Sequence, residues 1–375
     1  MRKKTEAETK NTKEKKQAVP YVPFRKPFKN NHDVFFGYCA IMSNPNGDPA
    51  NENHPRQDDV TERLEVSDVR IKRTVRDEII SLAAELAKTI YVDNTVRTVD
   101  MRYKALESDL MQMQDVVFEA NLSLFEDAQA ELGLPFDKKA LMERLASPEI
   151  GGDPVNRAKA ILGECWDVRC FGAVFPVKNR NFSWAGPVQV LWSHSMHAAV
   201  VEYMSGTGAF ASQDATKKTF SGRYLTPFAL IGVPVAISNN HLRSGLIEQE
   251  PPTDEDIEFF LRGLYNGTNN LRTTSKNQHS CFLLDIVYKE GERYSHSAKL
   301  PEEVKLLNPG TGARLTREEE LSLRSLEDIE IDFSNVSRFV ESNRDKIESA
   351  KIYVIPGLKV RGCESLETVV VPAAF

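Results

Sequence analysis

The sequence has few cysteines, no long apolar run and no apolar leader, and each absence excludes a class of protein. Its 5 cysteines in 375 residues include no C-x-x-C pair, which argues against a zinc ribbon and a dense disulfide framework. The best uncharged candidate for a membrane span, residues 224–242, contains two prolines and two asparagines. Residues 1–30 carry 10 basic and 3 acidic residues without an apolar stretch, unlike a secretory signal peptide. We therefore expect a cytoplasmic protein in a reducing compartment, without a membrane span.

Acidic residues are missing from four long windows, although the whole chain has a net charge of −6. The windows are Val69–Arg76, Val168–Val201, Ala215–Ile247 and Phe259–Leu284, and together they hold 14 basic and no acidic residues in 101 positions. Surfaces of this kind tolerate a polyanion, because binding responds to the local field rather than to the net charge. Burial is a simpler explanation, and it accounts for most of the pattern in Val168–Val201.

Hydrophobic patterns along the chain predict an α+β fold. Apolar, β-prone runs predict strands at 33–42, 167–174, 188–192, 228–237, 281–288 and within 350–371. Apolar residues at helical spacing predict one helix from Ser67 to Ile90 and another that begins after Thr253, where a threonine can cap it. The order strand, helix, strand, strand, helix, strand is that of a split βαβ, ferredoxin-like sheet.

Three segments stand apart from this sheet plan. The basic residues 1–30 read as a flexible tail in front of a single domain, residues 31–375. Residues 91–164 are mainly helical and polar in pattern, which predicts an inserted helical subdomain. Residues 204–223 are too weakly apolar for a core and too long for a tight turn, which predicts a projecting hairpin or a mobile loop.

The predicted first helix carries a cationic cluster in its N-terminal turns: Arg70, Lys72, Arg73 and Arg76. Lys72 and Arg76 share a face, and the helix N-terminus itself attracts anions, so the cluster has the outline of a phosphate site. The alternative is a solvated helix face that pairs with Asp77 and Glu78. The charge pattern alone favours neither interpretation.

Three further segments supply polar and basic groups. The loop after the first strand is Asn44-Pro-Asn-Gly-Asp-Pro49, followed by Asn51, Asn53, His54 and Arg56. The projecting segment holds Lys217, Lys218, Arg223 and Tyr224, and the segment after the second helix holds Arg272 and Lys276. Each segment alone reads more simply as a turn or a solvated loop. Together they suit a polyanion that is tracked along a surface.

Catalytic patterns are scarce in this sequence. It has no Gly-rich phosphate loop or nucleophile-elbow motif, and His194 and His197 have no carboxylate nearby, which favours a structural role over a metal site. The enzymatic alternative is an RNA-cleaving enzyme in which a divalent ion is held by Asp48, Asp58, Asp59 and Asp68. The prolines and asparagines around Asp48 explain the same loop as a turn.

Several segments, taken in order, resemble one protein family. They are NPNGDPANENHPRQDD followed by SDVRIKRTVRD, then DVRCFGAVF, GPVQ and DEDIEFFLRGLYNGTNNLRTTSK, and they lie within residues 33–290. These segments resemble the backbone subunit of type I CRISPR surveillance complexes, the seventh family of CRISPR-associated proteins, and most closely its type I-B branch. Residues 1–30 and the acidic stretch 302–348 match nothing in that pattern.

The resemblance implies a fold and a function. The implied fold is an RRM-like (ferredoxin-like) palm with an inserted helical fingers subdomain at 91–164 and a protruding thumb hairpin at 202–224. In that family, several copies polymerise head to tail along one CRISPR guide RNA, grip its phosphates and present its bases to target DNA. The other subunits are a guide-end-processing or capping subunit and large and small subunits. Members of this type do not cleave, and no cofactor or metal is expected.

The resemblance also implies roles for individual residues. The phosphate track would be lined by Asn44, Asn46, Arg56, Ser67, Arg70, Lys72 and Arg73, with Arg169 and Phe171 on the adjacent strand. The thumb base would hold Lys217, Lys218, Arg223 and Tyr224, and the loop facing the RNA would hold Arg272 and Lys276. The middle of the thumb diverges from the family, and Phe210 is the candidate there for the residue that displaces a base. The competing hypothesis is a metal-dependent ribonuclease of the type III relative's kind that uses Asp48.

Overall fold

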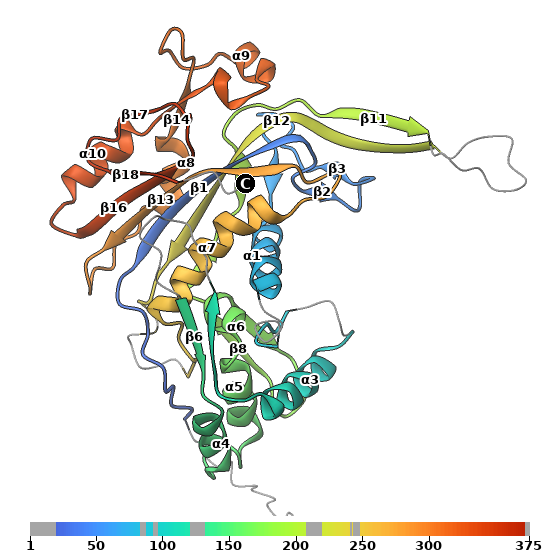
Figure 1. The fold of residues 1–375 in the computed structure, drawn as a ribbon, viewed down its shortest axis with the longest axis vertical. Helices are drawn as coiled ribbons and strands as arrows, with labels where there is room; N and C mark the ends of the chain where they lie inside the picture. Colours follow the sequence, from blue (N-terminus) through green and yellow to red (C-terminus); the bar gives the residue numbers. More distant parts are fainter. Residues whose placement is uncertain are drawn as a thin grey trace, which may run out of the picture.

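The computed structural model describes residues 20–82, 88–92, 97–120, 132–207, 220–240, 242 and 248–371. In this part of the chain, helices α1 (Asp68–Leu82) and α7 (Asp254–Asn270) cover one face of a large sheet, and C-terminal elements cover the other face. A lobe of short helices and hairpins lies beyond α1 and α7 (Figure 1). The predicted mixture of helices and sheets is therefore confirmed.

The main sheet has the strand order β18-β16-β13-β1-β12-β10-β4, and β9 also pairs with β12. Its strands are β1 (His32–Ser43), β4 (Glu65–Val66), β9 (Val188–Val190), β10 (Ser193–Ser195), β12 (Phe220–Ile237), β13 (Gln278–Tyr288), β16 (Ile347–Val354) and β18 (Glu367–Val370). Strand β1 is antiparallel to β12 and β13, and β12 is antiparallel to β9 and β10. Strands are thus present at all the predicted places except the first part of 167–174.

Strand β1 lies between two hydrophobic cores, because successive side chains of a strand point to opposite faces of the sheet. Val34 and Phe36 join the core that includes α1 and α7, whereas Phe35 joins the core under the C-terminal elements. The pairing with β13 shifts register after Gly37, and a Cβ atom at this glycine would lie 2.0 Å from the ring of Phe282. Burial on both faces explains why this segment reads as an almost continuous apolar run.

Helix α1 packs its apolar stripe, Ile71, Val75 and Ile79, into the core beneath the sheet. It ends at Leu82, and Ile90 is buried in a segment that is not helical. The predicted extension of this helix to Ile90 is therefore wrong, because helical spacing alone does not separate a helix residue from a buried residue of the following loop.

Helix α7 begins where the sequence predicts. Thr253 accepts the N–H of Asp256, and the Asp256 carboxylate accepts the N–H of Thr253, which makes a reciprocal capping box. The helix then buries Ile257, Phe260 and Leu264 against the sheet.

The C-terminal elements cover the second face of the main sheet. They are the short strands β14 (Lys305–Leu307), β15 (Glu330–Asp332) and β17 (Val360–Arg361) and the helices α8 (Leu300–Glu303), α9 (Arg317–Ser322) and α10 (Ser334–Ser342), with 3-10 turns at Ser297–Lys299 and Leu326–Asp328. Ile331 and Val336 pack into the second core, together with Phe282 of β13. This acidic part of the chain is therefore a folded layer of the molecule.

The lobe beyond α1 and α7 contains helices (Figure 1) and the antiparallel strand pairs β5–β6 and β7–β8. Its elements are α3 (Val99–Gln112), β5 (Val116–Ala120), β6 (Leu132–Phe136), α4 (Lys138–Ala146), α5 (Pro154–Gly163), α6 (Trp166–Phe171), β7 (Gly172–Phe175) and β8 (Phe182–Ala185). The side chains of Thr98, Asp137 and Asp153 cap α3, α4 and α5. The hairpin of β5 and β6 was not predicted within the helical insertion.

The strand predicted at 167–174 is wrong in its first part, because Trp166–Phe171 forms helix α6 and only Gly172–Phe175 forms a strand. A short buried apolar run does not distinguish a strand from a buried helix by periodicity. Here, the Asp167 carboxylate accepts the backbone N–H groups of Tyr91 and Val92 at 2.7 and 3.1 Å. These tertiary contacts hold the segment in place, and local propensity does not reveal them.

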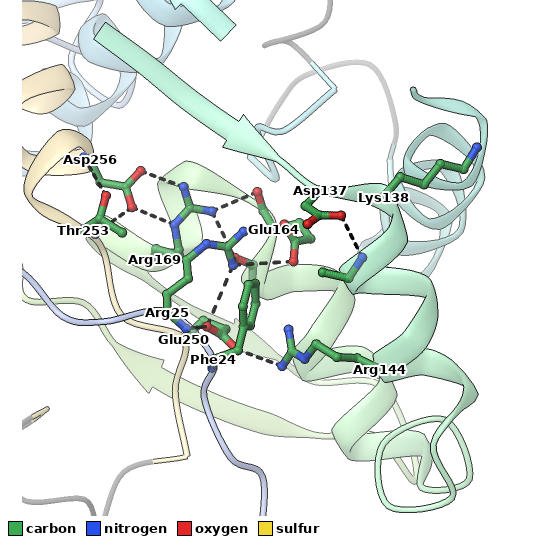
Figure 2. A network of polar contacts seen from close by, with 12 residues as sticks. Phe24, Arg25, Asp137, Lys138, Arg144, Glu164, Arg169, Glu250, Thr253 and Asp256 are labelled. Carbon is green, nitrogen blue, oxygen red and sulfur yellow. Dashed lines mark hydrogen bonds and ion pairs between the residues drawn. The ribbon is translucent and has the colours of Figure 1, made fainter. Parts of the chain in front are cut away.

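Residues 20–30 form an ordered strap, which corrects the prediction of a flexible tail for this part; residues 1–19 lie outside the described residues. Tyr21 and Phe28 are buried in the main core. The buried carboxylate of Glu250 accepts the Tyr21 hydroxyl at 2.7 Å and the Phe24 N–H at 3.2 Å. The strap therefore connects the helical lobe to the segment that leads into α7 (Figure 2).

A long hairpin projects from the main sheet, as Figure 1 shows. Strand β11 (Glu202–Thr207) pairs with the first residues of β12, and the register places Tyr203 opposite Tyr224. Phe210, Lys217 and Lys218 lie outside the described residues. None of the helices in the described ranges combines the length and the apolarity that a membrane crossing requires.

Candidate functional site

Two loops that are far apart in the sequence meet at the end of β1. The Asn44 N–H donates to the carbonyl of Ser275 at 2.9 Å, and the Lys276 ammonium donates to the carbonyl of Asn44. The loop continues through the small hairpin of β2 (Gly47–Asp48) and β3 (His54–Pro55), and the Arg56 N–H donates to the Asn46 carbonyl at 3.0 Å. These contacts bring the predicted residues of the first loop and of the segment after α7 to one place.

Two cations at this place lack a carboxylate partner among the described residues. Arg70, in the first turn of α1, donates to the Thr74 hydroxyl, and Lys276 donates only to a backbone carbonyl. Burial, and then the charge of Arg70, lower the pKa of the Lys276 ammonium to about 8. Burial also lowers the pKa of Arg70. An anion placed between these groups would relieve both the desolvation and the repulsion between them.

Two buried polar atoms of the loop after β1 have no hydrogen-bond partner among the described residues. The Oδ1 atom of Asn44 and the Nδ2 atom of Asn46 are buried without one, although the side chain of Asn44 also donates to the Asn53 carbonyl at 2.7 Å. A buried polar group without a partner costs about 1–3 kcal/mol, so such groups are rare in folded proteins. A phosphate oxygen would accept from the Asn46 amide. We call Asn44, Asn46, Arg70 and Lys276 the open cluster.

Arg56 borders the open cluster but has a carboxylate partner. Its guanidinium lies 3.2 Å from the Asp48 carboxylate, and both side chains are about one-third exposed. Such a pair is weak in water and opens easily. Arg56 can therefore exchange Asp48 for a phosphate at little cost.

An aromatic stack lies at the base of the projecting hairpin. The ring of Tyr224 lies 4.7 Å from His54 and 5.0 Å from Tyr203, between ring centres. Tyr203 is 60% exposed, and a Cβ atom at Gly222 would lie 1.8 Å from its hydroxyl, so the glycine makes room for this ring. An exposed aromatic ring beside cationic groups is a suitable surface for a nucleobase.

The other basic residues of α1 have carboxylate partners. Lys72 pairs with Asp68 at 2.9 Å, Arg73 with Asp77 at 2.6 Å, and Arg76 with the buried Asp167 at 2.8 Å. The alternative of a paired helix face is therefore confirmed for Asp77, whereas Glu78 accepts from Asn270 instead.

Phe171 is the second aromatic contact of α1. It lies at the end of α6, and its ring centre is 5.6 Å from the Lys72 ammonium and 5.0 Å from the Arg76 guanidinium. Phe171 also packs edge-on against Phe260 of α7. The position predicted for it, on a strand, is wrong, but its proximity to the basic helix is real.

Arg169 does not belong to the candidate surface, which corrects its predicted place on the phosphate track. It is 6% exposed, and its guanidinium donates to both carboxylate oxygens of Asp256 at 2.8 and 2.7 Å and to the carbonyls of Gly163 and Glu164 at 3.0 Å (Figure 2). The carboxylate raises the pKa of Arg169 against the effect of burial. With these four donated bonds inside the fold, Arg169 is a structural residue.

Arg169 belongs to a network that we call the closed cluster: Arg25, Arg144, Glu164, Arg169, Glu250 and Asp256 (Figure 2). Arg25 pairs with Glu164 at 2.5 Å, and Arg144 pairs with Glu250 at 2.9 Å. Here each charge has a partner of opposite sign. The closed cluster therefore presents no free charge to a ligand.

The remaining predicted residues have simpler surroundings. Ser67 precedes α1, and its hydroxyl accepts the Arg70 N–H at 3.4 Å, so it acts as the cap of this helix. Arg223 and Arg272 are exposed, and Arg272 donates to the carbonyl of Asn269 at 3.3 Å. Lys217 and Lys218 lie outside the described residues.

A scan of the chain against protein-family models matches residues 30–334 to the model described as CRISPR-associated protein Cas7. The chain belongs to the Cas7 family. The matched residues include the whole open cluster, whereas strands β16 and β18 lie after the matched range. The predicted resemblance to the seventh family of CRISPR-associated proteins is thereby confirmed.

Individual relatives are more distant. The CRISPR-associated protein Cas7 of Haloferax volcanii is 23% identical over 348 residues, which is 86% of this chain and 86% of the relative. A chain of a CRISPR RNA-guided surveillance complex, pre-nicking, is 14% identical with a TM-score of 0.48, and the match covers 91% of this chain and 96% of that chain. A chain of another such complex is 10% identical with a TM-score of 0.44 and coverages of 90% and 94%.

The four aspartates proposed as metal ligands of a ribonuclease do not form a metal site. Asp48 pairs with Arg56, Asp68 pairs with Lys72, and Asp58 accepts the N–H and hydroxyl of Thr61 at 2.6 and 2.7 Å. Asp59 is exposed. Among the described residues, no three His, Cys, Asp or Glu side chains gather into a possible metal site.

The two histidines of the H-x-x-H pattern do not act together. His197 is buried, its Nδ1 atom lies 2.7 Å from the Ala198 carbonyl, and its Nε2 atom accepts the Leu230 N–H at 3.1 Å. His194 is exposed and lies 3.8 Å from Glu65. The structural role that the sequence favours for this pair is thus supported for His197 by its contacts.

Sequence reasoning missed Tyr203 and the carboxylates Asp167 and Asp256. Tyr203 becomes recognisable only once the hairpin register is known, because its partner Tyr224 is 21 positions away in the sequence. Asp167 lies 91 positions from its partner Arg76, and Asp256 lies 87 positions from its partner Arg169. No spacing rule for a single helix or strand reaches that far.

Proposed function

We propose that this chain is the guide-RNA-binding backbone subunit of a type I CRISPR surveillance complex, of the type I-B branch. The observation that carries the proposal is the open cluster, where two desolvated cations and an unpartnered amide donor converge at the end of β1. RNA phosphates supply the missing anion. Phosphate contacts do not depend on base sequence, as a protein that serves any guide requires.

The neighbouring residues extend this contact into a track. Arg56, Lys72 and Arg73 have partly exposed carboxylate partners that a phosphate can replace. Arg272, in the segment after α7, and Arg223, on β12, are exposed. The exposed Tyr203 ring, stacked on Tyr224, offers a surface for a base. The track proposed from these groups passes from α1 to the base of the hairpin.

The architecture supports the family's division into palm, fingers and thumb. The order β13-β1-β12-β10, with α1 after β1 and α7 after β12, is the order expected of a ferredoxin-like palm. In this proposal, residues 91–164 are the fingers and 202–224 are the thumb, within a single domain. Copies associate head to tail along the RNA, because a heterologous interface that does not close builds a filament.

The subunit is proposed to act without catalysis. Base pairing between the guide and target DNA carries the sequence information, and the protein holds the guide in place beside the capping, large and small subunits. Incubating the assembled complex with complementary RNA and Mg²⁺ tests this point. Cleavage at regular intervals that disappears in Asp48→Ala would establish the ribonuclease instead.

The decisive experiment removes the two unpaired cations. In Arg70→Gln/Lys276→Gln, guide affinity should fall by about 10- to 100-fold for each side chain, since a charge-assisted hydrogen bond contributes about 1.5–3 kcal/mol. The loss should be the same for guides of unrelated sequence, measured by filter binding at fixed salt. The control Lys299→Gln/Arg338→Gln removes two exposed charges from the C-terminal layer and should bind as the wild type does.

Three outcomes would contradict the proposal. The first is wild-type affinity in the double variant, and the second is a loss confined to particular guide sequences. The third is a failure to co-purify with guide RNA at all. Circular dichroism of both variants separates loss of binding from loss of folding.

A further inference from the structure

A second cationic site lies on the opposite side of the main sheet from α1. A cavity of about 630 Å³ opens between the sheet edge at β9 and β10 and the C-terminal layer. Its wall includes Leu191, Trp192, His194 and Met196 on the sheet side and residues from α8, β14 and α9 on the other. Its size lies within the range of small-ligand pockets. None of its lining residues belongs to the open cluster.

Three basic residues from three separate segments line this cavity. They are Arg63 from the loop before β4, Lys305 of β14 and Arg314 from the loop before α9. None of the three forms an ion pair with any residue in the described ranges. Burial, and then the nearby charge of Arg314, lower the pKa of Lys305. The three cations therefore have no direct ion-pair partner among the described residues, as in the open cluster.

Two carboxylates also line the cavity, and they do not neutralise it. Glu320 accepts the backbone N–H of Ala198 at 2.8 Å, which fixes its carboxylate at the wall. Glu302 is exposed and favours the charged form of Lys305, against the effects of burial and of Arg314. Glu303, outside the lining, also favours the charged form of Lys305. Among the lining residues, three basic side chains face these two acidic ones.

The cavity also exposes an indole ring. Trp192 is 46% exposed at its wall, whereas the other two tryptophans, Trp166 and Trp184, are 0% and 6% exposed. A large aromatic residue of this kind is usually buried in a folded chain. An exposed aromatic face beside cations stacks a base while the cations hold its phosphate.

We propose that this cavity binds a nucleotide of a single-stranded nucleic acid, with its base on Trp192 and its phosphate among Arg63, Lys305 and Arg314. The site is separate from the guide track and holds a second strand. A purely acidic peptide would satisfy the cations but would leave the indole without a partner. The combination of the two features therefore favours a nucleotide.

Tryptophan fluorescence tests the proposal, because Trp192 is the accessible reporter among the three tryptophans. The full-length Arg70→Gln/Lys276→Gln protein, with the guide track disabled, is titrated with an unlabelled single-stranded DNA hexamer. Emission should be quenched in a saturable way. Adding Lys305→Gln/Arg314→Gln should raise the half-saturating DNA concentration by at least about tenfold and flatten its salt dependence.

Matched variants complete the test. Lys299→Gln/Arg338→Gln, which removes two charges outside the cavity lining, should titrate as the parent does. Trp192→Phe should abolish the quenching, and a fluorescently labelled hexamer should still bind to it, more weakly than to the parent. Arg63→Gln provides an independent variant of the same charge cluster if the double substitution at 305 and 314 impairs folding.

Several results would overturn the proposal. The first is constant emission on addition of DNA, and the second is unchanged quenching after Lys305→Gln/Arg314→Gln. A hexaglutamate peptide that changes the Trp192 emission at lower concentration than the DNA would assign the cavity to an acidic protein segment. Quenching in the Arg70→Gln/Lys276→Gln protein supports nucleotide binding in the cavity even if the guide-binding proposal is wrong. Each proposal can therefore be refuted independently of the other.

Discussion

The closed cluster around the strap and the open cluster at the end of β1 use the same kinds of side chain in opposite ways. In the closed cluster, Arg169 donates to Asp256 and to two carbonyls, and Glu250 accepts from Tyr21 and Arg144. In the open cluster, Arg70 and Lys276 have no carboxylate partner among the described residues. A buried charge that is paired holds the fold together, whereas one without a partner is available to a ligand.

The surroundings explain why each cluster persists. The closed cluster joins the strap, α6 and the start of α7, and its carboxylates Glu250 and Asp256 are fully buried. Breaking one pair would leave a buried carboxylate without a counter-charge. The open cluster carries its own penalty in the RNA-free protein, because desolvation disfavours the charged amine of Lys276. The comparison therefore predicts opposite consequences for stability and for binding.

The largest expected effect is a loss of folding stability in Arg169→Ala. The substitution leaves the Asp256 carboxylate buried and unpaired, which should lower the free energy of unfolding by about 3–5 kcal/mol. Urea unfolding followed by circular dichroism measures this change. Folded Arg169→Ala should bind guide RNA with wild-type affinity, because Arg169 faces the core.

Arg272→Ala is the matched control, since this arginine is exposed and should change stability by less than about 0.5 kcal/mol. A loss below about 1 kcal/mol in Arg169→Ala would mean that the closed cluster does not hold the fold together.

Ion pairs within α1 are easier to predict from sequence than either cluster, although only the pairing with Asp77 was predicted here. Asp68 with Lys72 and Arg73 with Asp77 are four positions apart, which is the spacing of neighbours on a helix. The pair of Arg169 with Asp256 depends on α6 packing against α7, and the isolation of Lys276 depends on two loops meeting. Both are consequences of tertiary structure, so Arg169 and Lys276 look alike in the sequence and differ in the fold.

The fold itself was more predictable than its details. Strand β1 and the cap at Thr253 follow from local rules of apolar patterning and helix capping. Helix α6 and the hairpin of β5 and β6 do not, because short apolar segments fit either conformation until their neighbours are known. The ordered strap was missed because Tyr21 and Phe28 stand among charged and proline residues in the sequence. Their partners are distant: Tyr21 donates to the buried Glu250, and the Phe28 N–H donates to the Pro252 carbonyl.

The second prediction concerns the pH dependence of the open cluster. In the RNA-free protein, Lys276 has a pKa of about 8, and bound phosphate should keep it protonated. Guide affinity should therefore fall as pH rises above about 8, by up to about tenfold per pH unit. Binding titrations between pH 7 and pH 9.5 measure this effect. Lys276→Arg should remove it, because a guanidinium remains charged throughout that range.

Stability of the RNA-free protein should change in the opposite direction over the same interval. The folded-state pKa of Lys276, about 8, lies below the ordinary lysine value of 10.5, so the unfolded chain holds more protons between these pH values. This group should therefore add stability as pH rises from about 8 towards 10.5. An affinity profile that is flat in the wild type, or that persists in Lys276→Arg, would remove Lys276 from the phosphate contact.

The smallest effect should come from converting paired cations into unpaired ones. Asp68→Asn/Asp77→Asn leaves Lys72 and Arg73 without their partners on α1, at a cost of a few tenths of a kcal/mol for each exposed pair. Guide affinity should then rise by a few-fold at low salt, because Lys72 and Arg73 no longer have to leave a carboxylate in order to bind a phosphate. The gain in affinity should shrink as the salt concentration increases. Glu318→Gln/Glu327→Gln removes two exposed acids from the C-terminal layer and controls for net charge. If both double variants gained equally, the partners on α1 would have no special role, and the contrast between paired and unpaired cations would reduce to overall charge.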